Sequence, residues 1–345
     1  MIKINKSPVL TSKNYGVNYF EIDEEVLNQN LKNDIVVIQK NDICVCKKTF
    51  KNKPHSLISD KLDNQIQNHT NFSKNFVLGT DTKDVFEISF QNQKILCDAL
   101  QLTVNSQVSA KAIVRYSTID TMYHNGALKI YVKENANLDL AVVYDISPLS
   151  NNFASIEIFC DTNSQFNLHV FDFGSHNSVQ NITINLKGDL SKVNLNSVYF
   201  GTNFHKLSFN YLINIFGKKC DANMDVCGVL NAKSQKNFLG TINFKKGSSK
   251  SVGSESEHCV LLSNLAKANS TPILLSAEED VNGKHSSSIG KIDDEELFYI
   301  MCRGISKSEA TKMLVKAKLS NISNKLFDEN LKNEILKRID EKIDE

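Results

Sequence analysis

The stretch Asn181–Leu186, with the sequence NITINL, alternates polar and apolar residues at every step. A period of two puts all the apolar side chains on one face of an extended strand, so the pattern predicts a half-buried β-strand. Ser155–Phe159 (SIEIF) shows the same alternation. The short polar segments Asp161–Ser164 and Lys187–Asp189 follow these two runs, as expected for tight turns between strands.

Similar runs recur from about residue 76 to residue 281, and no long helical pattern interrupts them. Asparagine-rich turns at nearly regular spacing favour a parallel β-helix, in which each coil stacks on the previous one. The same alternation is compatible with an antiparallel double sandwich, because no strict short repeat is present. The predicted strands are Val85–Phe90, Lys94–Leu96, Ala112–Tyr116, Leu128–Val132, Leu138–Tyr144, Ser155–Phe159, Gln165–Phe171, Val179–Leu186, Val193–Tyr199, Lys206–Phe216, Asp225–Leu230 and Gln235–Phe244.

The segment before these strands has a mixed pattern. Ile22–Leu31 has apolar residues at helical spacing, and Pro54–Asn71 predicts an amphipathic helix. Between them, Asp34–Cys46 is rich in β-branched residues and predicts a strand or hairpin. We therefore expect residues 1–75 to form a mixed N-terminal region.

The last fifty-odd residues predict three helices. Ile292–Cys302 begins with acidic residues, which the helix dipole favours, and Leu331–Ile343 is amphipathic. Between these two segments, Ser306 and Glu309 have the spacing of a capping box, which predicts a helix start. The expected buried stripe of this middle helix comprises Ala310, Met313, Leu314 and Ala317. So few residues cannot bury all their apolar faces against one another, so the β body or a partner must cover some of them.

Composition narrows the class of protein. The 345 residues contain 40 Lys plus Arg and 39 Asp plus Glu, a net charge of +1, which argues against nucleic-acid binding by bulk electrostatics. No run approaches the ~18 apolar residues of a membrane helix. Met1–Leu10 lacks the apolar core of a signal peptide, so we expect no membrane association and a cytoplasmic location. Arginine occurs only at Arg115, Arg303 and Arg338, which disfavours an enzyme that clamps anions with guanidinium groups.

The 8 cysteines are dispersed and include no CxxC pair. Cys44 and Cys46 would point to one face of a strand, and we interpret them as core residues rather than a metal pair. Cys220 and Cys227 lack a second pair of ligands, so a zinc site is disfavoured there.

The most specific segment runs from residue 259 to residue 306. Six short elements follow one another at characteristic spacing in it: Val260–Ser263, Lys267–Pro272, Glu279–Val281, His285–Gly290, Asp293–Tyr299 and Arg303–Ser306. This ordered set resembles the C-terminal signature of the SufB/SufD family, which belongs to the SUF machinery of iron–sulfur cluster assembly. The resemblance implies a mainly β protein with a right-handed parallel β-helix core over residues 76–290, followed by a C-terminal helical domain over residues 291–345.

The resemblance also implies a non-enzymatic scaffold. In this family, two chains pair through their β-helices. For this protein, the pair could be a homodimer or a heterodimer with a SufB-like chain, and both remain open. The C-terminal helices are expected to dock a SufC-type ATPase. The sequence contains no GxxxxGK[ST] motif, so the chain itself is expected to bind no nucleotide through a P-loop.

The resemblance suggests site residues near the end of the β-helix. His285 matches a histidine of the D-type branch, whereas Glu257 and Ser286 stand where the B-type branch has a cysteine and a glutamate. Cys259 lies two residues after Glu257. On a strand, a shift of two residues returns the side chain to the same face, about 6–7 Å along the strand. Thiolate and imidazole are ligands of iron, so Cys259 and His285 are the candidate metal ligands for a transient iron–sulfur cluster or for iron. Glu257 and His258 are candidate additional donors.

Two other functions remain open at this point. One is a purely architectural partner subunit that keeps the fold and the ATPase contact but never ligates iron. The other is a β-helix polysaccharide lyase or hydrolase, which would need an exposed acidic cluster, often with Ca²⁺.

Overall fold

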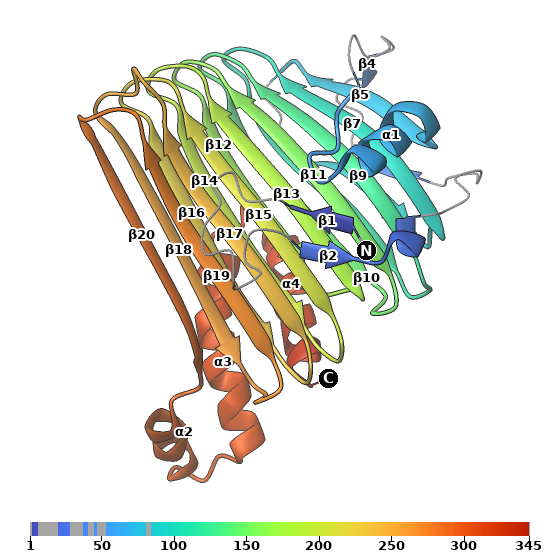
Figure 1. Ribbon diagram of the computed structural model, residues 1–345, viewed down its shortest axis with the longest axis vertical. Helices are drawn as coiled ribbons and strands as arrows, with labels where there is room; N and C mark the ends of the chain where they lie inside the picture. Colours follow the sequence, from blue (N-terminus) through green and yellow to red (C-terminus); the bar gives the residue numbers. More distant parts are fainter. Residues whose placement is uncertain are drawn as a thin grey trace.

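The computed structural model describes residues 2–5, 20–27, 37–40, 45–46, 53–80 and 84–344. Its body is a β-solenoid of two nine-stranded sheets (Figure 1). One sheet contains β3 (Val37–Lys40), β6 (Phe86–Gln91), β8 (Ser109–Thr118), β10 (Asn137–Ile146), β12 (Gln165–Asp172), β14 (Lys192–Gly201), β16 (Asp221–Leu230), β18 (Ser251–Leu261) and β20 (Val281–Lys291). The other contains β4 (Val45–Cys46), β5 (Phe72–Leu78), β7 (Ile95–Val104), β9 (Tyr123–Val132), β11 (Asn151–Cys160), β13 (Asn177–Leu186), β15 (Lys206–Ile215), β17 (Gln235–Phe244) and β19 (Lys267–Ser276).

From β5 onward, consecutive strands alternate between the two sheets, and each strand pairs in parallel with the strand two places along the chain. The antiparallel pairs β3–β6 and β4–β5 occur at the N-terminal end of the sheets. The parallel β-helix expected from the sequence is therefore confirmed, and the antiparallel sandwich is wrong. The division into residues 1–75, 76–290 and 291–345 stays a prediction.

The solenoid interior is filled by the apolar side of each alternating strand. The rings of Phe90, Tyr116 and Tyr144 stack in register on neighbouring strands, with centroids 5.1 Å apart at each step. At the turns, Asn135 and Asn163 adopt positive φ, which asparagine tolerates better than most residues. This backbone requirement accounts for part of the asparagine content of the turns.

Each outer face of the solenoid carries helices or short strands (Figure 1). The helix α1 (Asp60–His69) lies on the face formed by β7 and β9, next to the antiparallel pair of β1 (Ile2–Ile4) and β2 (Phe20–Ile22). Ser59 caps α1, so this helix begins later than the predicted Pro54. Of the helix predicted over Ile22–Leu31, the structure describes a short 3₁₀ helix at Glu24–Leu27, and residues 28–31 lie outside the described residues.

The C-terminal helices are α2 (Asp294–Met301), α3 (Lys307–Ser323) and α4 (Glu329–Asp344). The capping box of Ser306 and Glu309 is confirmed. The predicted buried face of α3 is wrong for Met313 and Ala317, because both residues are exposed. The helix instead turns Val315, Leu319 and Ile322 toward the sheet containing β14 and β16, where they join the α4 residues Leu331, Ile335 and Ile339 in one apolar cluster. The β body therefore covers α3 and α4.

The last coil of the solenoid, formed by β19 and β20, is open. Most residues of β19 are at least partly exposed, and nearly every residue of β20 is exposed. Pro272 lies within β19, and proline is tolerated in a sheet mainly on edge strands because it lacks an N–H donor. This end therefore presents two strand edges and the interior of the last coil to solvent.

Within the described part of the chain, no helix combines the length and the apolar character needed to cross a bilayer.

Candidate functional site

The strand β18 divides the predicted site residues between two faces. Glu255, Glu257 and Cys259 point into the solenoid and are buried, whereas His258 points outward and is exposed. This division follows from the two-residue period of a strand. The sequence therefore places Glu257 and Cys259 together but separates His258 from both of them.

Glu257 is the centre of a buried polar cluster. Its side chain and that of Lys236 on β17 are both 0% exposed, and the Lys236 Nζ lies 2.6 Å from Glu257 Oε1. The Tyr199 hydroxyl donates to the same oxygen at 2.8 Å. The hydroxyls of Ser270 and Ser287 donate to Oε2 at 2.7 and 3.2 Å. A buried carboxylate is stable only when it is paired and hydrogen-bonded in this way.

Tyr199 reaches this cluster because a glycine lies beside its ring. Gly228 pairs with Tyr199 on one side and with Cys259 on the other. A Cβ atom at Gly228 would lie 2.2 Å from the ring carbons Cε2 and Cζ, so only glycine leaves room for the tyrosine here. Burial raises the pKa of the Tyr199 hydroxyl well above its usual range, and the phenol therefore stays a proton donor to Glu257.

Cys259 lies at the edge of this cluster. Burial raises the pKa of its thiol, while the charge of Lys236 and a hydrogen bond with Tyr199 act in the opposite direction. The thiol is therefore held as the neutral species in this buried position, and it becomes a better metal ligand only when it is deprotonated. Lys236 is the nearby positive charge that would stabilise the thiolate.

Glu255 differs from Glu257 although it is only two residues away. It is 3% exposed, and neither carboxylate oxygen has a hydrogen-bond partner. Burial raises the pKa of this carboxyl to about 8, the charge of Glu257 adds to the shift, and Lys236 opposes it. Glu255 was not among the residues predicted from the sequence, although it shares the strand face of Glu257 and Cys259.

His285 lies in β20 and is exposed. It pairs with Glu255, whereas Ile289 pairs with Cys259. His285 and Cys259 therefore share a face but are offset by four residues, about 13 Å along the strand direction. Their side chains do not converge on one ion in this arrangement. Among the described residues, no group of three or more His, Cys, Asp or Glu side chains has the geometry of a metal site.

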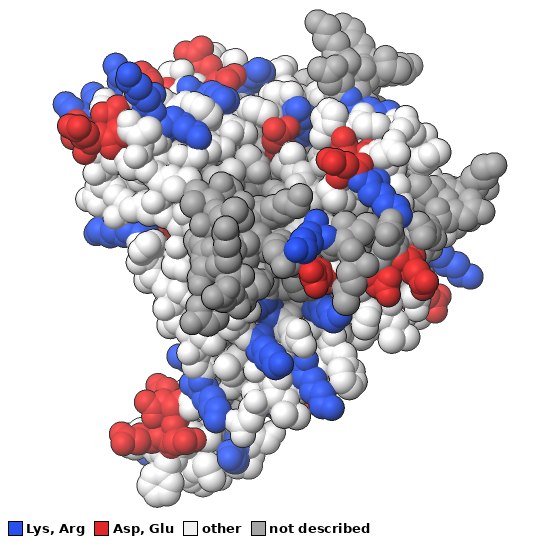
Figure 2. Space-filling view, viewed as in Figure 1, with Lys and Arg blue, Asp and Glu red and all other residues white. Residues whose placement is uncertain are grey.

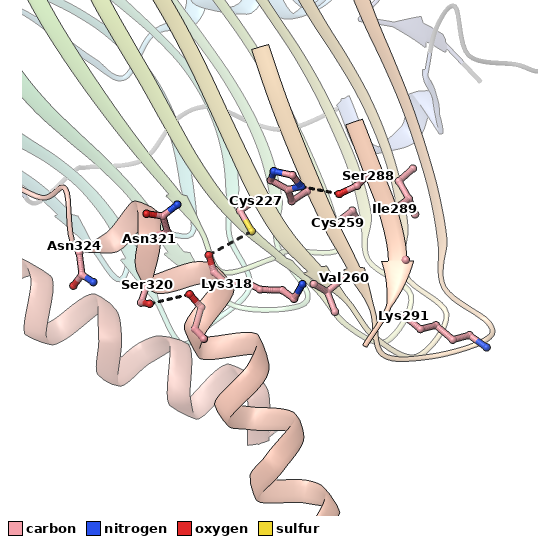
Figure 3. A pocket seen from close by; sticks show the side chains of 13 residues that line it. Cys227, Cys259, Val260, Ser288, Ile289, Lys291, Lys318, Ser320, Asn321 and Asn324 are labelled. Atoms are coloured by element: carbon pink, nitrogen blue, oxygen red, sulfur yellow. Dashed lines mark hydrogen bonds between the residues drawn. The ribbon is translucent and has the colours of Figure 1, made fainter. Parts of the chain in front are cut away.

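His258 lies in a groove on the opposite, outer face of β18. The groove has a volume of about 700 Å³, and β16, β18, β20 and α3 form its walls (Figure 3). The His258 ring nitrogen Nδ1 lies 2.7 Å from the Ser288 hydroxyl. Cys227 faces α3 across the groove, and burial raises the pKa of its thiol to about 12. His258 and Cys259 both border this groove, but their side chains lie on opposite faces of β18.

The lysine of the buried cluster was also missed from the sequence, although a signal was present. The strand Gln235–Phe244 alternates so that Lys236 shares its face with Phe238 and Ile242, both of which are buried. A lysine on the apolar face of a strand indicates a buried ion pair. The side chains of Cys44 and Cys46, which were predicted to share a strand face, are not among those that the structure describes.

These observations define a class of protein: a parallel β-solenoid that is open at one end, with a thiol, an imidazole and buried carboxyl groups on its last two coils and with helices at its C-terminus. Comparison with known families gives a more specific result. A family model described as "SUF system FeS cluster assembly, SufBD core domain" matches residues 87–318. The chain therefore belongs to the SufBD family of the SUF iron–sulfur cluster assembly system.

Individual relatives agree with this assignment. The chain is 26% identical over 225 residues to the iron-sulfur cluster assembly protein SufD of Escherichia coli K12, which covers 65% of this chain and 53% of that protein. It is 30% identical over 161 residues to SufD of Bacillus subtilis, covering 47% of this chain and 37% of the relative. A SufBD family protein of Pyrococcus horikoshii is 42% identical over 67 residues, covering 19% of this chain and 15% of the relative. The chain thus matches about half, or less, of the length of these relatives.

Proposed function

We propose that this chain is a SufD-like scaffold subunit of the SUF complex. In this proposal it is not an enzyme and binds no nucleotide itself, it pairs with a second scaffold chain through its β-helix, and it binds a SufC-type ATPase through its C-terminal helices. The observation that carries the proposal is the SufBD core match over residues 87–318, which covers the solenoid from β6 to its open end coil together with α2 and the first part of α3. The polysaccharide-cleaving alternative finds no support in this family.

The proposed ATPase-binding surface is the α2 end of the molecule, which extends beyond the solenoid (Figure 1). Phe298 and Tyr299 on α2 are 67% and 62% exposed, and Met313 on α3 is also exposed. Acidic side chains gather over α2 (Figure 2), and its first turn contains Asp294, Glu295 and Glu296. An apolar patch bordered by negative charge suits a partner surface with an apolar centre and a basic rim.

The proposed pairing surface is the open end of the solenoid. The strand β20 pairs with β18 on one side, and nearly all of its residues are exposed. An unpaired strand edge is a template for adding a strand from another chain. Cys259 and His285 do not converge within this chain, so a cluster at this end would need ligands from the partner as well. Both a second copy and a SufB-like chain would satisfy this requirement.

The ATPase contact is tested by a substitution that leaves the fold intact. Deleting the helices from Ile292 onward is unsuitable, because α3 and α4 cover an apolar face of the solenoid. Phe298→Asp changes an exposed side chain, and Leu149→Asp is a matched control at another exposed position. We expect Phe298→Asp to abolish co-purification with the SufC-type ATPase, whereas Leu149→Asp retains it. Equal retention by both variants would contradict the proposed surface.

The purely architectural role is the second candidate, and the burial of Cys259 favours it. A buried thiol with a raised pKa is a poor ligand until it loses its proton. Anaerobic reconstitution of the paired scaffold with iron and sulfide separates the two roles. Loss of cluster absorbance in Cys259→Ser and His285→Ala, with retention in the exposed-cysteine variant Cys302→Ser, supports cluster ligation. Unchanged absorbance in all three variants leaves the architectural role.

A further inference from the structure

A second groove lies on the outer face of the solenoid, where β12, β14, β16 and β18 run side by side. It has a volume of about 570 Å³, and the connection between α3 and α4 contributes Lys325 to its wall. Nearly all of its lining residues are polar, and most of them carry amides or hydroxyls. We call it the amide groove. It includes neither Cys259 nor His285, so it is separate from the open end of the solenoid.

A ladder of side-chain hydrogen bonds forms the floor of the amide groove. The Asn223 amide donates to Asn194 at 3.3 Å, and the Asn194 amide donates to Asn167 at 2.8 Å. The Asn167 amide donates in turn to Asp139 at 2.6 Å. An amide group has two N–H donors and two acceptor lone pairs, so Asn194 and Asn167 each keep one of both beyond the ladder. The floor can therefore give and accept hydrogen bonds with a polar ligand.

His169 is a buried polar side chain in the wall of the amide groove. It is 3% exposed, and its Nδ1 forms no hydrogen bond with any described residue. Burial lowers the pKa of its ring to about 4, and the charge of Lys325 adds to this shift, so the ring is neutral at pH 7. Native structures rarely leave a buried polar atom without a partner. The unpaired nitrogen therefore points to a partner from outside the chain.

Two of the described residues that line the amide groove are charged, Lys325 and Asp225. The Lys325 Nζ lies 2.9 Å from Asp225 Oδ2 and donates to Asn196 Oδ1 at 3.3 Å. Burial acts to raise the pKa of Asp225, but hydrogen bonds from Ser256 and Lys325 lower it below its usual range, so the group is a carboxylate. The ammonium has a third N–H and the carboxylate has further lone pairs. Because the two side chains are 45% and 29% exposed, both can also contact a ligand.

We propose that the amide groove binds a small zwitterionic α-amino acid. The ligand's carboxylate accepts hydrogen bonds from Lys325 and Asn196, and its ammonium group donates to Asp225. Its side chain lies toward His169. A ligand with only a carboxylate is repelled by Asp225, and a ligand with only an ammonium group is repelled by Lys325, whereas a zwitterion matches both charges. The inference goes beyond the scaffold function and does not depend on it.

The experiment is a titration of the full chain with L-serine, followed by NMR of the histidine ring C–H resonances. His169→Gln identifies the resonance of the His169 ring. The matched probes are 3-hydroxypropionate, which is serine without its ammonium group, and ethanolamine, which is serine without its carboxylate. The matched variants are Lys325→Met and Lys316→Met, since Lys316 is also an ion-paired lysine of this helical region but pairs with Asp340, away from the groove.

We expect L-serine to shift the His169 resonance with a dissociation constant on the order of 1 mM. Both single-charge probes should bind about tenfold or more weakly, and so should L-serine to Lys325→Met, because one charge contact is lost in each case. Lys316→Met should bind L-serine as the natural chain does.

The absence of any shift at about 10 mM L-serine would overturn the inference. Equal binding of 3-hydroxypropionate or of inorganic phosphate would also overturn it, because the groove would then accept anions in general. Unchanged binding by Lys325→Met would have the same consequence. The comparison of the three probes uses the natural chain, so it holds even if a variant fails to fold. Co-purification with the ATPase tests a different surface, so the two proposals can fail independently.

Discussion

The buried ion pair of Lys236 and Glu257 gives the sharpest quantitative prediction. Both side chains are 0% exposed, and the carboxylate accepts hydrogen bonds from three hydroxyl groups besides the lysine. Glu257→Ala leaves the ammonium uncompensated and those hydroxyls without their acceptor. Removing one partner of a buried pair costs about 3–5 kcal/mol, so we expect a loss of stability of this size.

The double variant Lys236→Met/Glu257→Gln should recover most of this loss. It removes both charges at once, and replacing a buried pair by neutral groups of similar volume is often close to neutral. Lys236→Met alone leaves the Glu257 carboxylate buried with its three hydroxyl donors, so we expect it to cost somewhat less than Glu257→Ala. The coupling between the two positions should then be several kcal/mol, well above the additivity error of about 0.5 kcal/mol.

The assay is equilibrium urea unfolding followed by far-UV circular dichroism. Because each coil contacts only its neighbours, hydrogen exchange of the amides of β17 and β18 will show whether the loss is local to the end coils. A cost below about 1 kcal/mol for both single variants, or a double variant equal to their sum, would refute the reasoning. Such a result would mean that water reaches the pair and screens it.

Three further predictions concern other parts of the solenoid. The folded-state pKa of Glu255, about 8, lies above the ordinary 4.5, so this group favours the folded state at low pH and its contribution is lost as the pH rises from 4.5 to 8. This loss of stability is at most about 5 kcal/mol. In Glu255→Gln the thermal midpoint should therefore change less between pH 5 and pH 8.5 than it does in the natural chain. Parallel curves of midpoint against pH for the variant and the natural chain would contradict this. Gly228→Ala should cost about 2 kcal/mol or more in urea unfolding, because its Cβ would overlap the buried ring of Tyr199; an unchanged midpoint would disprove the packing. Arg338→Ala should cost less than about 1 kcal/mol, since its ion pair with Asp145 is partly exposed, and a much larger loss would show that this pair anchors α4.

Several elements were predictable from the sequence because their signals are local. Asn181–Leu186 alternates with period two and forms most of β13. Ser306 and Glu309 have capping-box spacing, and the box is present at the start of α3. Family membership followed from the ordered elements around His285, and the SufBD core match agrees.

The error in the predicted buried stripe of α3 has a physical cause. Met313 was expected in the buried stripe of α3, because helical spacing alone does not say which side of a helix meets the sheet. In the structure, Val315 and Leu319 face the sheet, and Met313 is exposed.

No strict repeat was visible in the sequence because the coils differ in length: Asn151 pairs with Asn177, whereas Gln235 pairs with Lys267. The later coil is therefore longer by several residues.

The sequence by itself determined the strands from β6 to β17, the turns between them, the cap of α3 and the family, since each depends on residues close together in the chain or on an ordered motif. Only the tertiary structure decided which side chains meet inside the solenoid. Lys236 reaches Glu257 across 21 positions, and Tyr199 reaches it across 58. Such contacts depend on the accumulated length of whole coils and on the two sheets facing each other, and both are set by packing rather than by any local pattern.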